Sequence, residues 1–179
     1  MLDPDDTFLV VVDVQGKLAQ LMHEKETLFA NLRKLIAGAK ALGLPILWAE
    51  QVPEKMGPTV PEVAELLAGL KPIAKSAFSC WGDARFREAV AALRRKQVLI
   101  GGIETHVCVY QTARDMAAEG FAVQVVADAV SSRAAENKAL GLERIRLAGA
   151  SLTSVEMCLM ELLRTAEHPA FREILKIIR

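Results

Sequence analysis

Residues 7–12 read TFLVVV, with one aspartate on each side of the run, Asp6 before it and Asp13 after it. Six successive uncharged residues, rich in β-branched side chains, have the length of a strand and leave it no charged face. Such a strand is typical of a parallel sheet that helices cover on both faces. The run therefore predicts a buried strand of an α/β fold, with Asp13 at its carboxyl end.

Further apolar runs of strand length follow, separated by stretches in which apolar residues recur at helical spacing. The predicted strands after the first are Pro45–Ala49, Ile73–Ala74, Gln97–Ile100, Phe121–Ala127 and Ser151–Ser154. The predicted helices cover residues 28–42, 86–93, 139–147 and 171–178. This alternation predicts a three-layer α/β/α sandwich with a central, mostly parallel sheet of the doubly wound, Rossmann-like kind.

The composition limits the classes of partner. The chain has 179 residues, a length that fits a single domain over residues 1–179, and its 22 basic and 22 acidic side chains cancel. A balanced charge disfavours nucleic acid or an anionic membrane as the main partner, and no apolar run has the roughly 18–20 residues of a membrane span. The acidic start MLDPDDTF is unlike a signal peptide. We expect a cytoplasmic protein that acts on a small molecule.

The cysteines also favour the reducing cytoplasm. Cys80, Cys108 and Cys158 are an odd number without a CxxC spacing, so neither a disulfide framework nor a zinc knuckle is expected.

Three reactive side chains follow predicted strands: Asp13, Lys75 and Cys108. Ligands of doubly wound sheets bind beyond the carboxyl ends of the strands, where the strand order reverses. If the order were 3-2-1-4-5-6, Asp13 and Cys108 would face each other across that crevice and Lys75 would approach from the third strand. An acid, a base and a thiol in one place can form a nucleophile with its activating groups.

Cys108 lies in GGIETHVCVYQTARDMAAEG at 101–120, where a glycine-rich strand end runs into a predicted helix. Free N–H groups in the first turn, the helix dipole and nearby Lys75 would favour a thiolate and could hold an oxyanion. Each residue also has a plain structural interpretation. Cys108 could be a small buried hydrophobe, Asp13 a cap, and Lys75 a solvated surface lysine.

Other side chains near strand ends are candidates for the substrate pocket. The candidates are Gln15, Trp48, Phe78 and Trp81. Cys80 is a candidate second accessible thiol, whereas Cys158 lies in a helical core pattern. His106, two residues before Cys108, is a poor candidate for the general base, because residues two apart at a helix start point in different directions. The proline-rich segment Gln51–Pro61 is a loop at the rim of the site or a plain connection.

Three segments resemble the signature segments of the isochorismatase-like cysteine hydrolases, a family that includes nicotinamidases and other amide and ureide hydrolases. They are VVDVQ at 11–15, KSAFS at 75–79 and GIETHVCVYQTA at 102–113. Two more stretches, VVADAVSSR at 125–133 and HPAFREI at 168–174, are most similar to the short isochorismatase domain-containing group. The resemblance implies the isochorismatase-like hydrolase fold and a homo-oligomer.

The resemblance also implies roles. Cys108 would attack a carbonyl carbon, Asp13 would take the thiol proton and later give it to the leaving group, and Lys75 would hold Asp13. The Ile103–Glu104 peptide bond would be cis, and the backbone N–H groups of Glu104 and Cys108 would form the oxyanion hole. The implied activity is hydrolysis of a small amide, ureide or ester through a thioester.

The chain departs from the family's metal-binding members. Nicotinamidases bind a metal through an Asp-x-His pair after the second strand and a further histidine, whereas the corresponding stretch here is WAEQVPEK. No histidine lies between His23 and His106. We therefore expect no metal and no other cofactor, and nicotinamide is a poor candidate substrate. Cys108 favours carbonyl chemistry over the vinyl-ether cleavage of isochorismate.

Two other functions stay open. In a hydrolase of the haloacid dehalogenase kind, Asp13 itself would attack, although Gln15 occupies the position where the phosphatases of that kind carry a second aspartate. A family member without activity could instead serve as an oligomeric scaffold or a redox-responsive protein. Activity that survives Cys108→Ala but not Asp13→Asn would indicate an aspartyl nucleophile.

Overall fold

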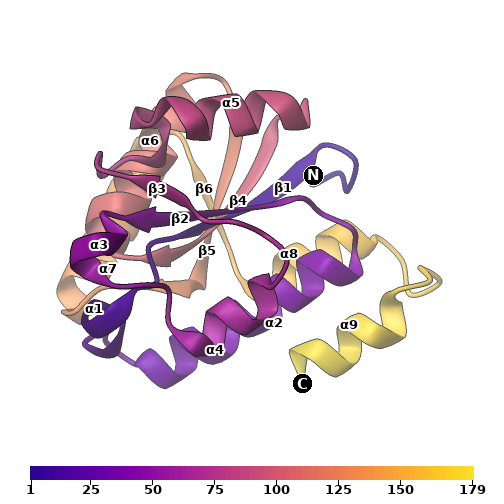
Figure 1. Ribbon diagram of the computed structural model, residues 1–179. Helices are drawn as coiled ribbons and strands as arrows, with labels where there is room; N and C mark the ends of the chain where they lie inside the picture. The colour runs from indigo at the N-terminus through magenta and orange to yellow at the C-terminus, as the bar shows by residue number, and fades with distance from the viewer.

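The computed structural model describes residues 1–179 and is built around one sheet of six parallel strands in the order β3-β2-β1-β4-β5-β6 (Figure 1). The strands are β1 (Thr7–Val12), β2 (Ile46–Gln51), β3 (Ile73–Lys75), β4 (Gln97–Ile103), β5 (Ala122–Ser131) and β6 (Ser151–Thr153). The prediction of a three-layer α/β/α sandwich is confirmed, and the sheet is parallel throughout. The strand order is the one that brings β1 and β4 together at the reversal of the chain.

The first strand has the predicted bounds. Strands β2 to β5 end later than predicted, and β6 ends one residue earlier. β5 extends to Ser131 because its pairing with β4 resumes beyond an irregularity at Ile100/Gly102, where Gly102 pairs with Val130. Asp128 interrupts the apolar run without ending the strand, and its carboxylate accepts the Val155 N–H at 2.9 Å.

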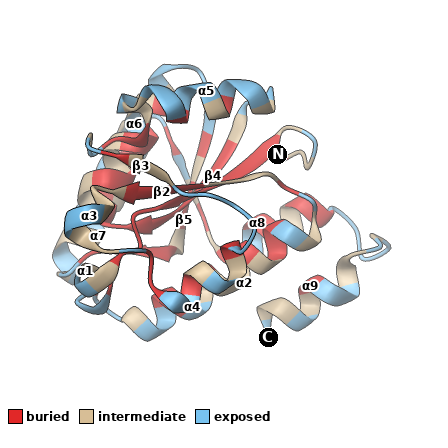
Figure 2. Ribbon diagram, viewed as in Figure 1, coloured by how far each residue is buried: buried red, intermediate tan, exposed pale blue.

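Successive residues of the strands contribute to opposite cores, as their alternating side-chain directions require. In β1, Leu9 and Val11 pack on one face, and Phe8, Val10 and Val12 pack on the other. The first face is covered by α2 (Lys25–Ala41), α4 (Pro61–Ala64), α8 (Val155–Leu163) and α9 (Phe171–Ile178). The second is covered by α5 (Ala84–Leu93), α6 (Tyr110–Ala118) and α7 (Ala135–Leu147). Figure 2 shows the buried strands between these layers.

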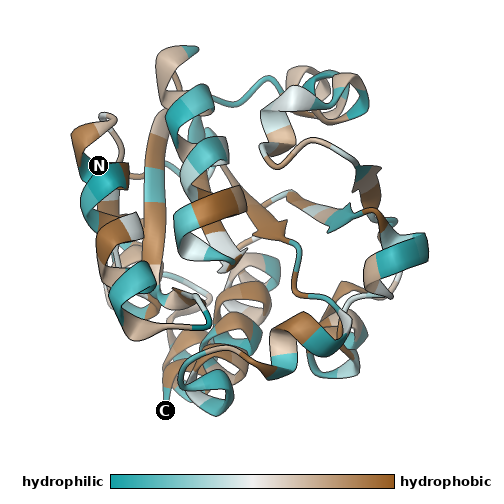
Figure 3. Cartoon of the chain, turned by 90° about the vertical axis from the view of Figure 1, so that its left-hand side faces the viewer, coloured by the Kyte–Doolittle hydropathy of each residue, from teal (hydrophilic) through white to brown (hydrophobic).

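Short elements gather at the carboxyl edge of the sheet. They are α1 (Gly16–Gln20), α3 (Pro53–Met56), the 3-10 turn η2 (Cys80–Gly82) and the π-helical turn η3 (Thr105–Val109), whereas the 3-10 turn η1 (Glu65–Leu67) continues α4 and packs on α2. The segment Gln51–Pro61 is therefore partly helical. Figure 3 views the molecule from this side, with the apolar strand ends framed by helices that carry both hydrophilic and hydrophobic segments. No helix of the structure combines the length and the apolar character needed to cross a membrane.

Gly102 allows β1 and β4 to approach at the edge where Asp13 lies. Its φ is +126°, and a Cβ at this position would collide with the Val12 carbonyl oxygen. We expect Gly102→Ala to lower the free energy of unfolding by about 3 kcal/mol or more, because both the backbone conformation and the space exclude a side chain. Urea unfolding measures this loss.

Gly120→Ala is the matched control for that variant. Gly120 also has a positive φ, +82°, but nothing lies within 4 Å of the place that a Cβ would occupy. Its replacement should therefore cost only the backbone strain, about 1 kcal/mol. Equal losses in the two variants would show that the contact with Val12 does not matter.

Candidate active site

The structure brings Asp13, Lys75 and Cys108 together from three elements. Asp13 follows β1, Lys75 ends β3, and Cys108 lies in η3, directly after β4. Asp13 and Cys108 line one cavity of about 150 Å³ at the carboxyl edge of the sheet. The other lining residues are Gln15, Leu18, Gln51, Met56, Phe78, Ile103, Glu104 and Val107.

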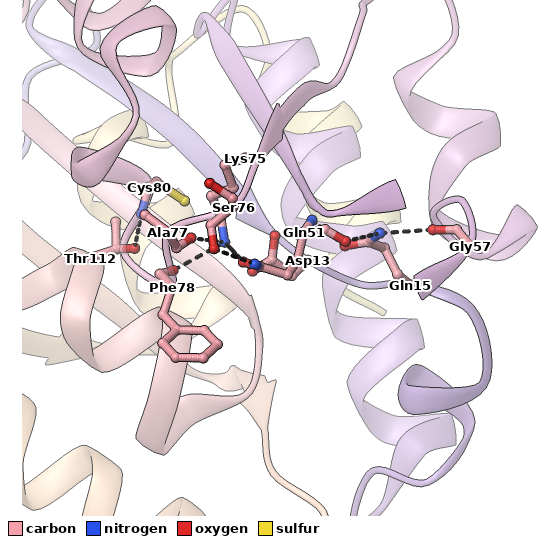
Figure 4. Close-up of polar contacts among 10 residues, drawn as sticks. All are labelled: Asp13, Gln15, Gln51, Gly57, Lys75, Ser76, Ala77, Phe78, Cys80 and Thr112. Carbon is pink, nitrogen blue, oxygen red and sulfur yellow. Dashed lines mark hydrogen bonds and ion pairs between the residues drawn. The ribbon is translucent and has the colours of Figure 1, made fainter. Parts of the chain in front are cut away.

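Lys75 is buried, and its charge is neutralised inside the protein (Figure 4). Its Nζ donates to Asp13 Oδ2 at 2.6 Å and to Gln51 Oε1 at 2.6 Å. The carbonyl oxygens of Ala77 and Phe78, in the loop after β3, lie 3.2 and 3.0 Å from the same nitrogen. An ammonium has three N–H donors, so four acceptors saturate it. Lys75 therefore orients and neutralises Asp13 and has no donor left for a ligand.

The two carboxylate oxygens of Asp13 differ, because one is hydrogen-bonded and the other is not. Oδ2 accepts from Lys75, whereas the buried Oδ1 has no hydrogen-bond partner. Burial raises the pKa of this carboxyl above its ordinary value of 3.8, and the charge and hydrogen bond of Lys75 reduce that rise without cancelling it. The residue also has φ +52°, an uncommon conformation for a side chain other than glycine. A buried oxygen without a partner is suited to receive a proton.

The Cys108 thiol is more difficult to ionise than the sequence predicts. Burial raises its pKa well above the ordinary value, and the negative charge of Asp13 raises it further, while Lys75 lowers it. The expected preference for a thiolate is thus wrong, because desolvation and Asp13 outweigh Lys75. The resting pair is a neutral thiol next to a carboxylate that can act as a base.

The turn that carries Cys108 exposes a backbone donor. The Ile103–Glu104 peptide bond is cis, as the resemblance implies. The Glu104 carbonyl oxygen accepts from the N–H groups of Val107 and Val109, at 3.1 and 3.2 Å, and the Glu104 N–H itself has no acceptor within the protein. Because Glu104 and Cys108 both line the cavity, the unpaired N–H belongs to the wall next to the thiol.

Gln15 and Gln51 hold the neighbouring part of the cavity wall together through hydrogen bonds. Gln15 donates through Nε2 to the carbonyl oxygens of Gln51 and Gly57, at 3.1 and 2.8 Å, and accepts the Gln51 N–H at 2.6 Å. Gln51 accepts from Lys75 and donates to the Ser76 carbonyl oxygen at 2.7 Å. Sequence reasoning named Gln15 and missed Gln51. The signal was available, because Gln51 is the polar residue that ends the β2 run ILWAEQ.

The structure corrects two of the pocket residues predicted from the sequence. Phe78 lines the cavity and is 56% exposed, whereas Trp48 and Trp81 do not line it. Trp48 belongs to the core on the face that α2, α4, α8 and α9 cover, and its Nε1–H donates to Thr59 Oγ1 at 2.8 Å. Trp81 packs edge-on against Phe121, with ring centroids 5.3 Å apart. Position after a strand does not determine to which side a side chain turns.

The two other thiols and His106 lie outside the cavity lining. Cys80 is buried, which raises the pKa of its thiol to about 12, so it is not the accessible second thiol that we expected. Cys158 is buried in α8. His106 Nδ1 lies 2.9 Å from Ser132 Oγ, and His106 does not line the cavity.

The end of β2, where nicotinamidases carry metal ligands, holds a different arrangement. Glu50 Oε1 accepts the N–H and the hydroxyl of Thr59, both at 2.7 Å. The structure contains no group of three or more His, Cys, Asp or Glu side chains that could hold a metal ion.

The sequence matches known proteins over almost its whole length. The family model described as the isochorismatase domain matches residues 7–157. Isochorismatase domain-containing protein 2A of Mus musculus is 36% identical over 176 residues, which are 98% of this chain and 84% of that protein. The secreted isochorismatase effector Isc1 of Phytophthora sojae (strain P6497) is 37% identical over 182 residues, 99% of this chain and 87% of that protein.

Solved structures share the fold. The MAR1 ribonuclease of Caenorhabditis elegans has a TM-score of 0.92 and 35% identity, covering 99% of this chain and 91% of that one. YcaC from Pseudomonas aeruginosa, solved with hexane-2,5-diol and covalent acrylamide, has a TM-score of 0.91 and 29% identity over 98% and 90% of the two chains. YcaC of Escherichia coli, described as an octameric hydrolase of unknown specificity, has a TM-score of 0.88 and 29% identity over 98% and 94%.

Proposed function

Because the chain belongs to the isochorismatase family, we propose that this site is that of a metal-independent cysteine hydrolase of small amides, ureides or esters. One observation carries the proposal. The Asp13 carboxylate has one oxygen held by Lys75 and a second that is buried and unpaired, and Asp13 lines the same cavity as Cys108. A thiol with an adjacent base is the arrangement that nucleophilic catalysis needs.

In the proposed reaction, Cys108 Sγ bonds to the carbonyl carbon while its proton passes to Asp13 Oδ1. The electron pair of the C=O bond moves to oxygen, where the backbone N–H groups of Glu104 and Cys108 stabilise it. Collapse of this intermediate breaks the bond to the leaving group, which takes the proton from Asp13. Water then gives a proton to Asp13 as its oxygen bonds to the thioester carbon. The C–S bond breaks, the departing Cys108 sulfur takes that proton back from Asp13, and the carboxylic acid is released.

The acid–base properties of the pair support this sequence of steps. The raised pKa of Asp13 makes it a better proton acceptor than an ordinary aspartate. The raised pKa of Cys108 means that the thiol gives up its proton during attack and not beforehand. Lys75 donates to Asp13 Oδ2 at 2.6 Å and so keeps the carboxylate oriented.

Two relatives support the reaction class. YcaC of Escherichia coli is described as a hydrolase, and YcaC of Pseudomonas aeruginosa was solved with covalent acrylamide. Acrylamide is a small neutral amide with an electrophilic double bond, so its covalent attachment requires a nucleophile on that protein. Cys108 with Asp13 would supply such a nucleophile here.

The ribonuclease from Caenorhabditis elegans makes RNA the second candidate substrate. The cavity favours the small molecule, because its volume of about 150 Å³ is below the roughly 300–1,000 Å³ typical of ligand pockets. Its two acidic lining residues, Asp13 and Glu104, are also unsuited to a phosphate backbone. Incubation of labelled RNA with the wild type and with Cys108→Ala tests this candidate. Cleavage that is lost in the variant would favour RNA.

The proposal predicts a single ionisation on the acidic side of the pH profile. Asp13 must be unprotonated to act as the base, so kcat/KM should fall as the pH falls through its pKa, which burial places above the usual aspartate range. Above the pKa of Asp13 and up to pH 9, kcat/KM should stay level, because the thiol reacts in its neutral form. The measurement is kcat/KM for amide hydrolysis from pH 4 to pH 9. A rate that instead rises through the ordinary thiol range, near pH 8.5, would show that a preformed thiolate is needed.

The assembly and the compartment belong to the same proposal. Because the Escherichia coli relative is octameric, we expect a homo-oligomer. The three cysteines are all unpaired, which suits the reducing cytoplasm, although the Phytophthora sojae relative is named a secreted effector.

A further inference from the structure

The cavity wall contains acidic side chains but no basic ones. Its lining is mostly apolar, with two carboxylates, Asp13 and Glu104, two amides, and no lysine, arginine or histidine. Each carboxylate is neutralised from outside the cavity. Lys75 pairs with Asp13 at 2.6 Å, and Arg133, which is itself largely exposed, pairs with Glu104 at 3.1 Å.

No positive charge is therefore left for a ligand. The Lys75 ammonium is saturated by its four acceptors, and Arg133 does not line the cavity. A carboxylate or phosphate that entered would lose its water without meeting a cation to pair with, which is unfavourable. An uncharged group would meet no such penalty.

The size and the polarity of the wall restrict the acyl group further. The cavity, about 150 Å³, is smaller than the roughly 300–1,000 Å³ typical of ligand pockets. Leu18 of α1, Met56 of α3 and Phe78 after β3 supply apolar surface from three separate elements. Such a wall favours a short aliphatic chain next to the reacting carbonyl.

Resting on the proposed cysteine hydrolysis, we propose that the substrate is an uncharged amide or ureide with a short aliphatic acyl group, and that carbonyl compounds bearing a second, anionic group are rejected. The two parts of the specificity come from different residues. Lys75 and Arg133 are already paired with Asp13 and Glu104, so no cation is left for an anionic group, and the apolar wall selects the chain.

The selection against charge can be measured without turnover. Iodoacetamide and iodoacetate are nearly equal in size and differ in charge, and both alkylate thiols. We expect Cys108 to prefer iodoacetamide over iodoacetate at least about 10²-fold more than glutathione does at the same pH, because an anion in this cavity would lose its water without gaining a counter-charge. Peptide mapping by mass spectrometry reads the rate at Cys108 alone. A preference equal to that of glutathione would overturn the inference.

Leu18→Arg supplies the missing cation and should shift this preference at least about tenfold towards iodoacetate. Leu21→Arg is the matched control, since Leu21 lies just beyond the same short helix, is 62% exposed and does not line the cavity. It should keep the wild-type preference. An equal shift in both variants would mean that the charge acts at long range and not through the cavity.

Ammonia release from isobutyramide and succinamate separates this inference from the proposed function. Faster hydrolysis of isobutyramide than of succinamate supports both the hydrolase function and the preference for uncharged substrates. Hydrolysis of neither amide, together with the expected alkylation preference, would contradict the hydrolase and support the neutral cavity. Faster hydrolysis of succinamate would support the hydrolase and overturn the inference.

Discussion

Replacing Cys108 with alanine is expected to lower kcat/KM for amide hydrolysis by at least about 10⁴-fold. The variant keeps the cavity, Asp13 and Lys75, but has no atom that can form the thioester. Water held near Asp13 and the backbone N–H groups would leave a small residual rate. Ammonia release under saturating and limiting substrate gives kcat and KM separately, and kcat should carry most of the loss.

Cys158→Ala is the control for this variant, because Cys158 is an equally unpaired cysteine buried in α8, outside the cavity. It should retain the wild-type kcat. Asp13→Asn tests the competing assignment, in which the aspartate attacks. Substantial activity in Cys108→Ala, combined with none in Asp13→Asn, would transfer the nucleophilic role to Asp13.

Lys75→Met is expected to lower the free energy of unfolding by about 3–5 kcal/mol and to abolish turnover. The substitution preserves the length of the side chain but leaves the Asp13 carboxylate buried without a counter-charge. The side chains of Lys75 and Asp13 are only 1% and 5% exposed, so water cannot replace the lost ammonium without opening the site. Urea unfolding at pH 7 measures the loss.

The double variant Asp13→Asn with Lys75→Met tests the reason for that loss. With no charge left at the site, the double variant should be more stable than Lys75→Met alone, while its activity stays absent. This pattern would identify the unpaired charge as the cause of the instability. If the losses of the two single variants simply add in the double variant, packing and not charge determines the stability.

The main features of the fold follow from patterns that are visible along the chain. The run TFLVVV has no charged residue, and it forms β1 with the predicted bounds because both of its faces are buried. The meeting of Asp13, Lys75 and Cys108 follows from topology, since parallel strands place their carboxyl ends on one edge and the order of strands puts β1 beside β4.

Other features of the site depend on three-dimensional detail that spacing does not contain. The sign of the pKa change at Cys108 is set by its burial and by its proximity to Asp13, whereas a sequence shows only the helix start and the nearby lysine. Trp81 follows β3 as Phe78 does and Trp48 lies within β2, yet of these three only Phe78 lines the cavity. Gln51 gains its place through hydrogen bonds to partners far along the chain.

The thioester on Cys108 is the central claim, and trapping it is the most direct test. The protein is mixed with a small neutral ester such as methyl isobutyrate, stopped with acid within milliseconds, and examined by intact-mass measurement and peptide mapping. An ester acylates a thiol faster than an amide does, so the intermediate should accumulate. We predict one isobutyryl group per chain, located on Cys108 and absent from Cys108→Ala. Product formation in ¹⁸O-labelled water without any acyl group on Cys108, and with ¹⁸O appearing in the Asp13 carboxylate, would contradict the account.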